Sequence, residues 1–409
     1  MLWTVPSLIA TPMSCSFHMA YASSGVGGSM NILFRADLSR YVAHRPSVLY
    51  WVLQPGADVG GIGMGLVRMV RPWYEWLIVW GYDITQPPPV VDAALATQVA
   101  RQLVGDPALE IELLSANTWT VNNMYATRLQ RGRVFIMGDA AHRHPPSNGL
   151  GSNTSIQDAF NLAWKLALVL RGSASERLLD SYEAERRPIG MRNVDWAMFT
   201  ALNHGVLDAG MGFSPVQTPE LRRANFAAFF ADTPMGATRR ARAAEVFATQ
   251  RTEFQAHDLE IGYAYETGAL CPDGSAAPAR DPLGTRYVAT TRPGHRLPHA
   301  WLLDAGRRVS TLDLSGHSSS FVLLTTAGGK AWREAASHVF AARGVPLRVV
   351  TVDGAGCEDA EGRWADLRGV DDDGAVLVRP DNHVAWRHAG AHVDPATEMQ
   401  RVAGALLGG

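Results

Sequence analysis

The sequence predicts a mixed protein of the α+β and α/β classes, with an antiparallel sheet first, long helices in the middle and a βαβ domain at the C-terminus. Three observations predict this order. Runs of β-branched and aromatic residues separated by Pro and Gly fill residues 30–82. Apolar residues at helical spacing extend over most of residues 150–255. Beyond residue 290, short apolar runs alternate with two amphipathic helical patterns.

The first part of the chain predicts a sheet covered by one helix. Residues 1–28 have no clear helical or strand period and form an atypical N-terminal segment. A helix is expected to begin at the triple proline 87–89 and to run through Val104, where Gly105 ends it. The predicted strands are 30–34, 48–53, 66–70, 76–80 and 111–120.

The middle of the chain predicts a short strand, a polar loop and a series of helices. The run 134–137 is uniformly apolar and is expected to be a fully buried strand. After the loop 138–151, a helix is expected to continue to Leu170, with Gly172 ending it. Its apolar positions recur at spacings of three and four: Ile156, Ala159, Phe160, Ala163, Leu166, Ala167 and Leu170. Further helical patterns cover 181–201 and 221–255, and 271–298 is interpreted as a linker with a domain boundary near 290.

The C-terminal part predicts a thioredoxin-like order of elements, namely a βαβ unit followed by a hairpin and a helix. Residues 325–330 stand where a redox-active domain of this kind has a CxxC motif, and Cys357 is the domain's only thiol. The domain is therefore expected to be structural. The predicted strands are 301–303, 321–325, 347–352, 375–378 and 384–386, and the predicted helices are 331–342 and 396–407.

Composition excludes several classes of protein. Of the 409 residues, 47% are hydrophobic and 19% charged, as in folded globular proteins. The formal net charge of −2 means that no overall positive electrostatic field attracts a phosphate backbone, so no nucleic-acid partner is expected. Cys15, Cys271 and Cys357 lie far apart, which favours a reducing cytoplasm over a disulfide framework. The stretch 2–22 is interrupted by polar residues and follows no Lys or Arg, so neither a signal peptide nor a membrane span is expected.

The loop before the long helix has the properties of a cradle for an anionic group. Gly138 lets a ligand approach the backbone closely, and Asp139 can accept hydrogen bonds from sugar hydroxyls. Gly149 and Gly151 leave backbone N–H groups uncovered where the next helix begins, and the helix dipole favours a negative oxygen there. The sequence therefore predicts that this loop holds a ligand with oxygen-rich edges, such as a flavin.

These residues lie within a longer pattern that resembles single-component, FAD-dependent aromatic hydroxylases of the phenol hydroxylase type. The similarity extends from about residue 27 to the C-terminus. It implies a partial flavin hydroxylase fold in which 29–130 form the substrate-binding sheet domain and 131–200 the C-terminal part of the FAD-binding domain. Residues 201–290 would then be a helical segment and linker, and 291–409 the thioredoxin-like domain. The matching strings are 138–146 (GDAAHRHPP), 149–155 (GLGSNTS), 161–166 (NLAWKL) and 180–188 (DSYEAERRP), together with Asp158.

The resemblance implies roles for individual residues. Asp139 would bind the ribityl or pyrophosphate part of FAD, His142 would lie near the pyrophosphate, and residues 149–153 would meet the flavin ring. The expected cofactor-binding residues are Gly138, Asp139, His142, Pro145, Pro146, Gly149, Leu150, Gly151 and Asn153. Because pockets for aromatic substrates are mostly apolar, Trp51, Trp119 and Tyr125 in the sheet domain are candidates for lining one.

The reaction implied by the resemblance is hydroxylation of a phenol or chlorophenol ortho to its hydroxyl group. FAD would be reduced by NADPH and would react with O2, and the protein would be a homo-oligomer. The family opens with a GxGxxG βαβ unit for the ADP part of FAD and carries a carboxylate that helps to deprotonate the phenol. Neither is found in the 409 residues, where the most similar string, GIGMG at 61–65, lacks the glycine spacing. We therefore expect this chain to hold FAD weakly, and no catalytic residue is assigned.

Two alternatives stay open. The chain could be a non-catalytic remnant that keeps the sheet and the C-terminal domain without holding FAD. His142 and His144 could instead be ligands of a metal-dependent hydrolase, although a metal site needs further ligands from elsewhere in the chain.

Overall fold

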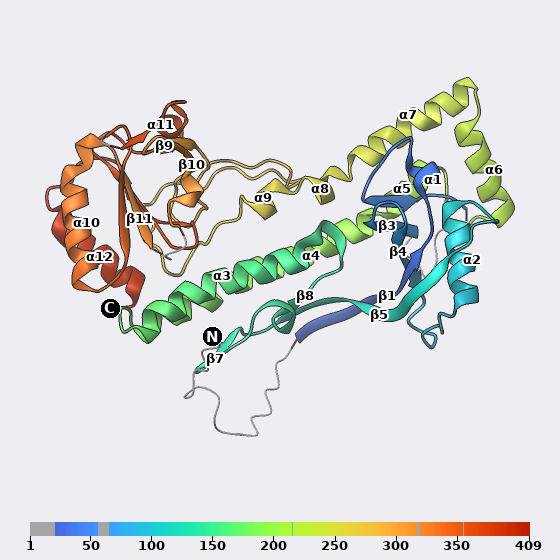
Figure 1. Cartoon of the computed structure of the whole chain (residues 1–409), viewed down its shortest axis with the longest axis horizontal. Coiled ribbons are helices and arrows are strands. Elements are labelled where there is room, and N and C mark those ends of the chain that lie inside the picture. Colours follow the sequence, from blue (N-terminus) through green and yellow to red (C-terminus); the bar gives the residue numbers. More distant parts are fainter. Residues whose placement is uncertain (1–20, 56–64, 215, 317–319, 355) are drawn as a thin grey trace.

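Two long helices connect a large sheet at one end of the molecule to a smaller domain at the other. The computed structural model describes residues 21–55, 65–214, 216–316, 320–354 and 356–409. Helices α3 (Leu150–Leu170) and α4 (Asp180–Asn203) run side by side between the two ends (Figure 1). The string 61–64 and most of the atypical segment 1–28 lie outside the described residues.

The large sheet has six strands in the order β2-β3-β4-β1-β5-β8 and is antiparallel throughout. One face is buried against α2, with Ile32, Ile78 and Val99 in a shared hydrophobic cluster. The predicted antiparallel sheet with one covering helix is therefore confirmed. Its elements are β1 (Tyr21–Arg35), α1 (Ser39–Val42), β2 (Leu49–Val52), β3 (Gly65–Arg71), β4 (Glu75–Tyr82), α2 (Ala93–Val104), β5 (Glu112–Ala126) and β8 (His142–Arg143).

Helix α2 begins later than the triple proline predicted. Asp92 is the N-cap, and its carboxylate accepts a hydrogen bond from the Leu95 N–H. Because the carboxylate satisfies one of the free donors of the first turn, the helix begins there and the prolines lie in the extended segment before it. Gly105 ends the helix with φ of 78°, as predicted.

The prediction of a fully buried strand at 134–137 is wrong. Strand β7 (Val134–Phe135) pairs with β6 (Gln130–Arg131) alone, in a small two-stranded sheet. Val134 is 50% and Met137 46% exposed. An apolar run is buried on both faces when it lies inside a layered sheet, and the described residues place no further strand beside this one.

Helix α3 presents a different face to the protein from the one its apolar pattern predicted. Ile156, Phe160 and Leu170 are 67%, 49% and 70% exposed. Asp158 and Lys165 are completely buried instead. Both buried groups bind charged partners on α4, Arg186 for Asp158 and Glu185 for Lys165, and these ionic contacts determine the orientation of the helix.

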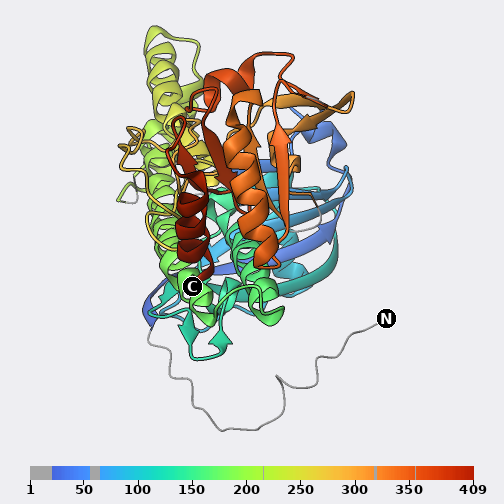
Figure 2. The same cartoon turned by 90° about the vertical axis from the view of Figure 1, so that its left-hand side faces the viewer.

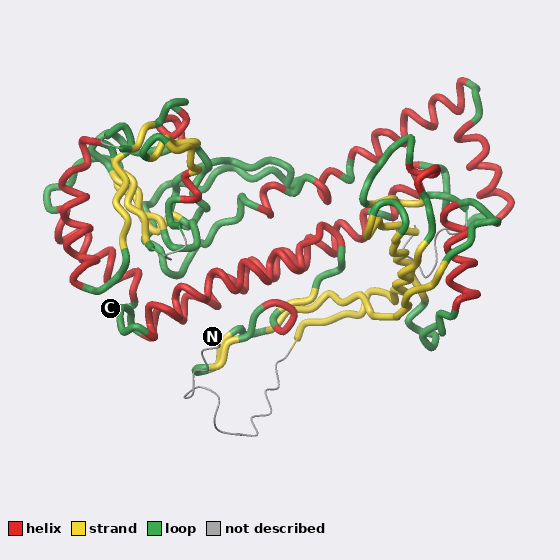
Figure 3. Tube along the Cα trace, viewed as in Figure 1, coloured by secondary structure: helices red, strands yellow, loops and turns green. Residues whose placement is uncertain are grey.

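The helical pattern at 221–255 is divided into several helices. It is covered by α6 (Pro219–Phe230), α7 (Pro234–Ala248) and α8 (Arg251–Phe254), and the short helices α5 (Gly205–Gly210) and α9 (His257–Glu260) lie before and after it. Pro219 and Pro234 stand at helix starts, where a missing N–H costs nothing, and Thr218 and Thr233 cap them. These helices and the linker after them return the chain to the second domain (Figure 3).

The C-terminal domain has the thioredoxin-like arrangement that the order of elements predicted. Its sheet has the order β12-β11-β14-β15, with the first pair parallel and the others antiparallel. Helices α10 and α12 lie side by side on one face (Figure 2). The elements are β9 (Trp301–Asp304), β10 (Arg307–Ser310), β11 (Phe321–Thr325), α10 (Lys330–Ala342), β12 (Leu347–Thr351), β13 (Cys357–Glu358), α11 (Arg363–Leu367), β14 (Ala375–Val378), β15 (Val384–His388) and α12 (Pro395–Leu407).

The C-terminal domain shares one hydrophobic cluster with the end of α3. The ring of Trp164 on α3 packs edge-on against Phe321 on β11, with the ring centroids 5.7 Å apart. The predicted domain boundary near 290 therefore does not separate two independent cores. Cys357 is buried in the other face of this domain, and burial raises the pKa of its thiol to about 11, as fits a structural residue.

Candidate active site

The candidate site is the loop between β7 and α3. Its short strand β8 pairs with β5 at the edge of the large sheet. The loop contains two turns of 3₁₀ helix, η1 (Gly138–Ala140) and η2 (Ser147–Gly149), on either side of β8. In β8, His142 pairs with Tyr125 of β5. Gly138 has φ of 59°, and a Cβ atom there would lie 3.1 Å from the Ser155 hydroxyl oxygen, so both the backbone and the space favour glycine.

Asp158 fixes the first half of this loop from inside the protein. Its carboxylate accepts hydrogen bonds from the Gly138 N–H at 3.1 Å, from His142 Nε2 at 2.7 Å and from Arg186 Nε at 2.7 Å. Burial alone would raise the pKa of Asp158, but the His142 hydrogen bond and the Arg186 charge outweigh it and lower the pKa. Asp158 therefore fixes the position of the loop, and Arg186 on α4 fixes the Asp158 carboxylate in turn.

The two histidines of the loop lie against each other. The rings of His142 and His144 are 4.8 Å apart, and His142 Nδ1 and His144 Nε2 are buried with no hydrogen-bond partner among the described residues. Burial and, to a smaller extent, the neighbouring His142 together lower the pKa of His144 to about 4, although Asp158 opposes both. Within the described ranges, no group of three or more His, Cys, Asp or Glu side chains could hold a metal ion.

The buried His144 makes a testable contribution to pH dependence. Between about pH 6.5 and pH 4 the unfolded state binds a proton that the folded state does not. The free energy of unfolding should therefore fall as the pH is lowered through this window, by about 1 to 3 kcal/mol from this residue. Urea unfolding of the chain and of His144→Gln should show the wild type losing stability relative to the variant between pH 6.5 and 4. If the difference in free energy of unfolding between the wild type and His144→Gln were the same at pH 6.5 and at pH 4, His144 would not be the source of this pH dependence.

Asn148 fixes the second half of the loop. It has φ of 63°, and its Nδ2 donates to the backbone carbonyls of Thr252 and Glu253 in α8. Its Oδ1 accepts from the Thr200 hydroxyl of α4 at 2.5 Å. Asn tolerates the left-handed conformation better than most residues, and here its side chain also ties the loop to two helices.

The other side of the loop is open and presents groups that fit a flavin dinucleotide. Asp139 is exposed, and its carboxylate makes no hydrogen bond with the described residues. It lines a cavity of about 110 Å³ with Met124, His142 and Arg143. The first turn of α3 has no side-chain cap, and the space at Gly149 is open. A free carboxylate can accept hydrogen bonds from sugar hydroxyls, and the N–H groups of an uncapped helix N-terminus can donate to a carbonyl edge. The residues present therefore fit the flavin and ribityl part of FAD.

The expected cofactor residues divide into two groups. Asp139, Pro146, Gly149 and Asn153 are exposed and Gly151 is partly exposed, whereas Gly138, His142, Pro145 and Leu150 are buried. His142 points to Asp158, and Leu150 packs against Ala197 of α4 in a hydrophobic cluster. Contact of all these residues with FAD stays a prediction.

The large sheet offers a second, partly covered face opposite α2. Trp51, Leu66, Val79 and Asn31 are paired in one row across β2, β3, β4 and β1, so their side chains share that face. Trp119 of β5 joins them, because its indole N–H donates to Asn31 Oδ1 at 3.2 Å. The structure thus places Trp51 and Trp119 on one half-buried face, as a substrate pocket would require.

Tyr125 lies further along β5, opposite His142. All three aromatic residues stay candidates for substrate contact.

Sequence reasoning did not identify several residues that shape the site. Arg186 stands in the string 180–188, to which the resemblance gave no role, whereas His204 and Glu253 lie far in sequence from the loop and in none of the matching strings. Asn148 could have been found, since an Asn beside Gly in a Pro-rich loop is typical of a left-handed turn.

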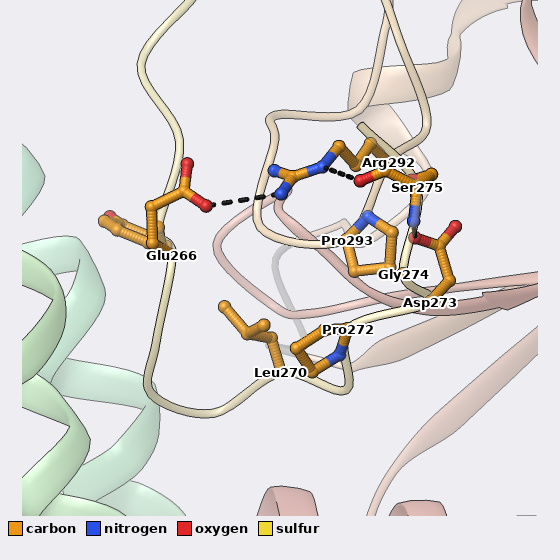
Figure 4. Close-up of a pocket in the computed structure, with 9 residues that line it drawn as sticks. Glu266, Leu270, Pro272, Asp273, Gly274, Ser275, Arg292 and Pro293 are labelled. Carbon is orange, nitrogen blue, oxygen red and sulfur yellow. Dashed lines mark hydrogen bonds and ion pairs between the residues drawn. The ribbon is translucent and has the colours of Figure 1, made fainter. Parts of the chain in front are cut away.

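A second cavity of about 110 Å³ lies in the linker, away from this loop (Figure 4). Arg292 crosses it, with Nε donating to the Ser275 carbonyl at 3.1 Å and Nη2 to Glu266 at 3.3 Å. The two carboxylates that line it are already paired, Glu266 with Arg292 and Asp273 with Arg387.

Comparisons with known proteins agree with this geometry. The family model described as FAD binding domain matches residues 14–197, and that described as aromatic-ring hydroxylase, C-terminal, matches residues 290–409. The solved flavin-dependent monooxygenase PieE, in complex with FAD and substrate, superimposes with a TM-score of 0.84 at 40% identity, covering 95% of this chain and 67% of that one. The chain belongs to the FAD-dependent aromatic hydroxylases.

Curated members of this hydroxylase family are also similar to the chain. A 2,4-dichlorophenol 6-monooxygenase of Cupriavidus pinatubonensis is 44% identical over 387 residues, which are 94% of this chain and 64% of that protein. A phenol 2-monooxygenase of a Pseudomonas species is 43% identical over 391 residues, 92% of this chain and 62% of that protein. The chain thus spans somewhat less than two thirds of the length of these two relatives. No helix of the described part is long and apolar enough to cross a membrane.

Proposed function

We propose that this chain is the greater part of a monooxygenase that hydroxylates a phenol or chlorophenol ortho to its hydroxyl group, using FAD, NADPH and O2. The observation that carries the proposal is the open side of the loop, which presents the free carboxylate of Asp139 near its beginning and the uncapped start of α3 at its end. The identity to phenol and dichlorophenol monooxygenases supports the choice of substrate.

The residues of the loop would hold the flavin half of the cofactor. Asp139 would accept hydrogen bonds from the ribityl hydroxyls, and the N–H groups from Leu150 onward would bind the carbonyl edge of the ring. When bound, FAD supplies the reduction by NADPH and the activation of O2. Asp158 keeps the loop in shape by holding the Gly138 N–H from the other side.

The half-buried face of the large sheet would hold the phenol. Trp51 and Trp119 would supply apolar contacts that orient the aromatic ring and exclude water. The two cysteines of the described part, Cys271 and Cys357, are free and buried, which supports a reducing cytoplasm as the compartment. Assembly into a homo-oligomer remains part of the proposal.

The proposal is tested by adding excess FAD, NADPH and 2,4-dichlorophenol to the chain in air. The expected result is NADPH oxidation that depends on the phenol, with a catechol carrying one oxygen atom from O2. Asp139→Ala should weaken FAD binding by about 1 to 3 kcal/mol, since the ribityl donors lose a charged acceptor. Asp232→Ala, which removes an exposed carboxylate far from the loop in sequence, is the control. Absence of any phenol-dependent oxidation at saturating FAD would favour the non-catalytic remnant.

A further inference from the structure

The half-buried face of the large sheet adjoins a histidine and carboxylate pair. The ring of Trp51 on β2 is 4.7 Å from the ring of His204 and 5.1 Å from that of Phe254 on α8. His204, at the end of α4, has its Nε2 2.5 Å from Glu253 Oε2. The side chains of His204 and Glu253 are only 12% and 7% exposed. An aromatic residue of the proposed substrate face thus contacts a nearly buried imidazole.

The same pair is joined to the loop that we propose to hold the flavin. Glu253 Oε1 accepts from the Asn148 backbone N–H at 3.4 Å, and the Asn148 side chain donates to the Glu253 carbonyl at 2.9 Å. Asn148 immediately precedes Gly149, the N-cap of α3. His204 and Glu253 therefore lie between the flavin loop and the aromatic face, where an aromatic substrate would have to meet the flavin.

The hydrogen bond fixes which nitrogen of His204 is free. In the neutral imidazole whose Nε2 donates to an ionised Glu253 carboxylate, Nδ1 keeps its lone pair. Within the described residues, the ring of His204 makes its hydrogen bond through Nε2 and none through Nδ1. A carboxylate that orients a histidine and stabilises its protonated form is a recurring arrangement in general-base catalysis.

We propose that His204 accepts the proton of the bound phenol through Nδ1, with Glu253 as the residue that positions it. This inference rests on the proposed function. The phenol O–H bond breaks, its electron pair stays on the oxygen, and an N–H bond forms at Nδ1. The resulting imidazolium is neutralised by Glu253, and the phenolate that remains is richer in electrons at its ortho carbon, where the proposed hydroxylation takes place.

The test uses 4-nitrophenol as probe, because its ionised form absorbs visible light and its neutral form does not. The full chain is titrated with the probe at a pH slightly below the probe's own pKa, and the ionised fraction of the bound probe is compared with that of the free probe. We expect binding to raise the ratio of ionised to neutral probe about tenfold, which is one unit of the probe's pKa. The affinity of His204→Asn for the probe should be within about threefold of the wild-type affinity. The probe bound to this variant should have the same ratio of ionised to neutral form as the probe in solution. Glu253→Gln should lose most of the enrichment.

His257→Asn is the matched control, since His257 Nδ1 lies 2.9 Å from Glu260 in a second His–Glu pair that is exposed. It should leave both the affinity and the ionised fraction unchanged. Enrichment that persists in His204→Asn would overturn the inference. Binding to the wild type without enrichment would also overturn it, whatever the variants do, while leaving the proposed function standing. Failure of the wild type to bind the probe would overturn both.

Discussion

Replacing Arg379 by methionine is expected to lower the free energy of unfolding by about 3 to 5 kcal/mol. Arg379 is completely buried, and its two Nη atoms lie 2.7 and 2.8 Å from the carboxylate oxygens of Glu185 on α4. Its Nε and Nη2 also donate to Asp381, at 3.0 and 2.5 Å. Methionine fills a similar volume but removes the positive charge, so two buried carboxylates lose their main partner.

The pKa values of Glu185 and Lys165 show how strongly the buried cluster depends on the positive charge of Arg379. Burial would raise the pKa of Glu185, but Arg379 and Lys165 outweigh burial and lower it to about 2. Burial, with the Arg379 charge, lowers the pKa of Lys165 to about 8, although Glu185 opposes this. The measurement is urea unfolding at neutral pH.

An exposed ion pair provides the control for this variant. Arg133 lies 2.7 Å from Glu176, with side chains 77% and 68% exposed. Arg133→Met should change the free energy of unfolding by less than about 1 kcal/mol, because water already solvates both charges. If Arg379→Met cost no more than Arg133→Met, the buried cluster would have no part in joining the C-terminal domain to α4.

Replacing Asp158 by alanine is expected to have an effect of similar size, about 3 to 5 kcal/mol, because it leaves the buried Arg186 without its carboxylate. The variant also removes the acceptor for the Gly138 N–H and for His142. We expect urea unfolding to show the loss of stability and limited proteolysis to cut the native protein faster within the loop 138–149.

Asp195→Ala is the control for the second variant, since Asp195 lies exposed on α4. It should stay within about 0.5 kcal/mol of the wild type and leave the rate of proteolysis unchanged. If Asp158→Ala lost stability without any increase in cleavage of the loop, Asp158 would stabilise the pairing of α3 with α4 but would not shape the loop.

Both variants probe contacts that connect parts of the chain distant in sequence. Arg379 belongs to the C-terminal domain, whereas Glu185 and Lys165 belong to the two long helices. The C-terminal domain therefore completes the packing of the helices that support the flavin loop, in addition to any part it has in assembly.

Much of the fold could be predicted because it follows from local patterns. The strands of both sheets alternate or cluster apolar residues, and Gly and Pro mark their ends, so element type follows from a few neighbouring residues. The failures occurred where burial depends on another element. Residues 134–137 are apolar enough for an inner strand, yet β7 has a single neighbour and stays exposed.

The sequence by itself determined the chemistry of the loop, the order of elements and the family. Glycine at 138 and 149, the carboxylate of Asp139 and the start of α3 belong to one short segment, so their relation is fixed by the covalent chain and by helix geometry.

Only the tertiary structure decided which face of α3 is buried and which residues meet the loop. The free energy of burying Asp158 or Lys165 depends on whether an opposite charge stands within hydrogen-bond distance, and no local pattern contains that information. Those charges come from Arg186 and Glu185, and Asn161 on the same helix reaches Asp381 across 220 residues of sequence. The pairing of His204 with Glu253 depends on the same kind of contact, because two helices must pack before the imidazole meets the carboxylate.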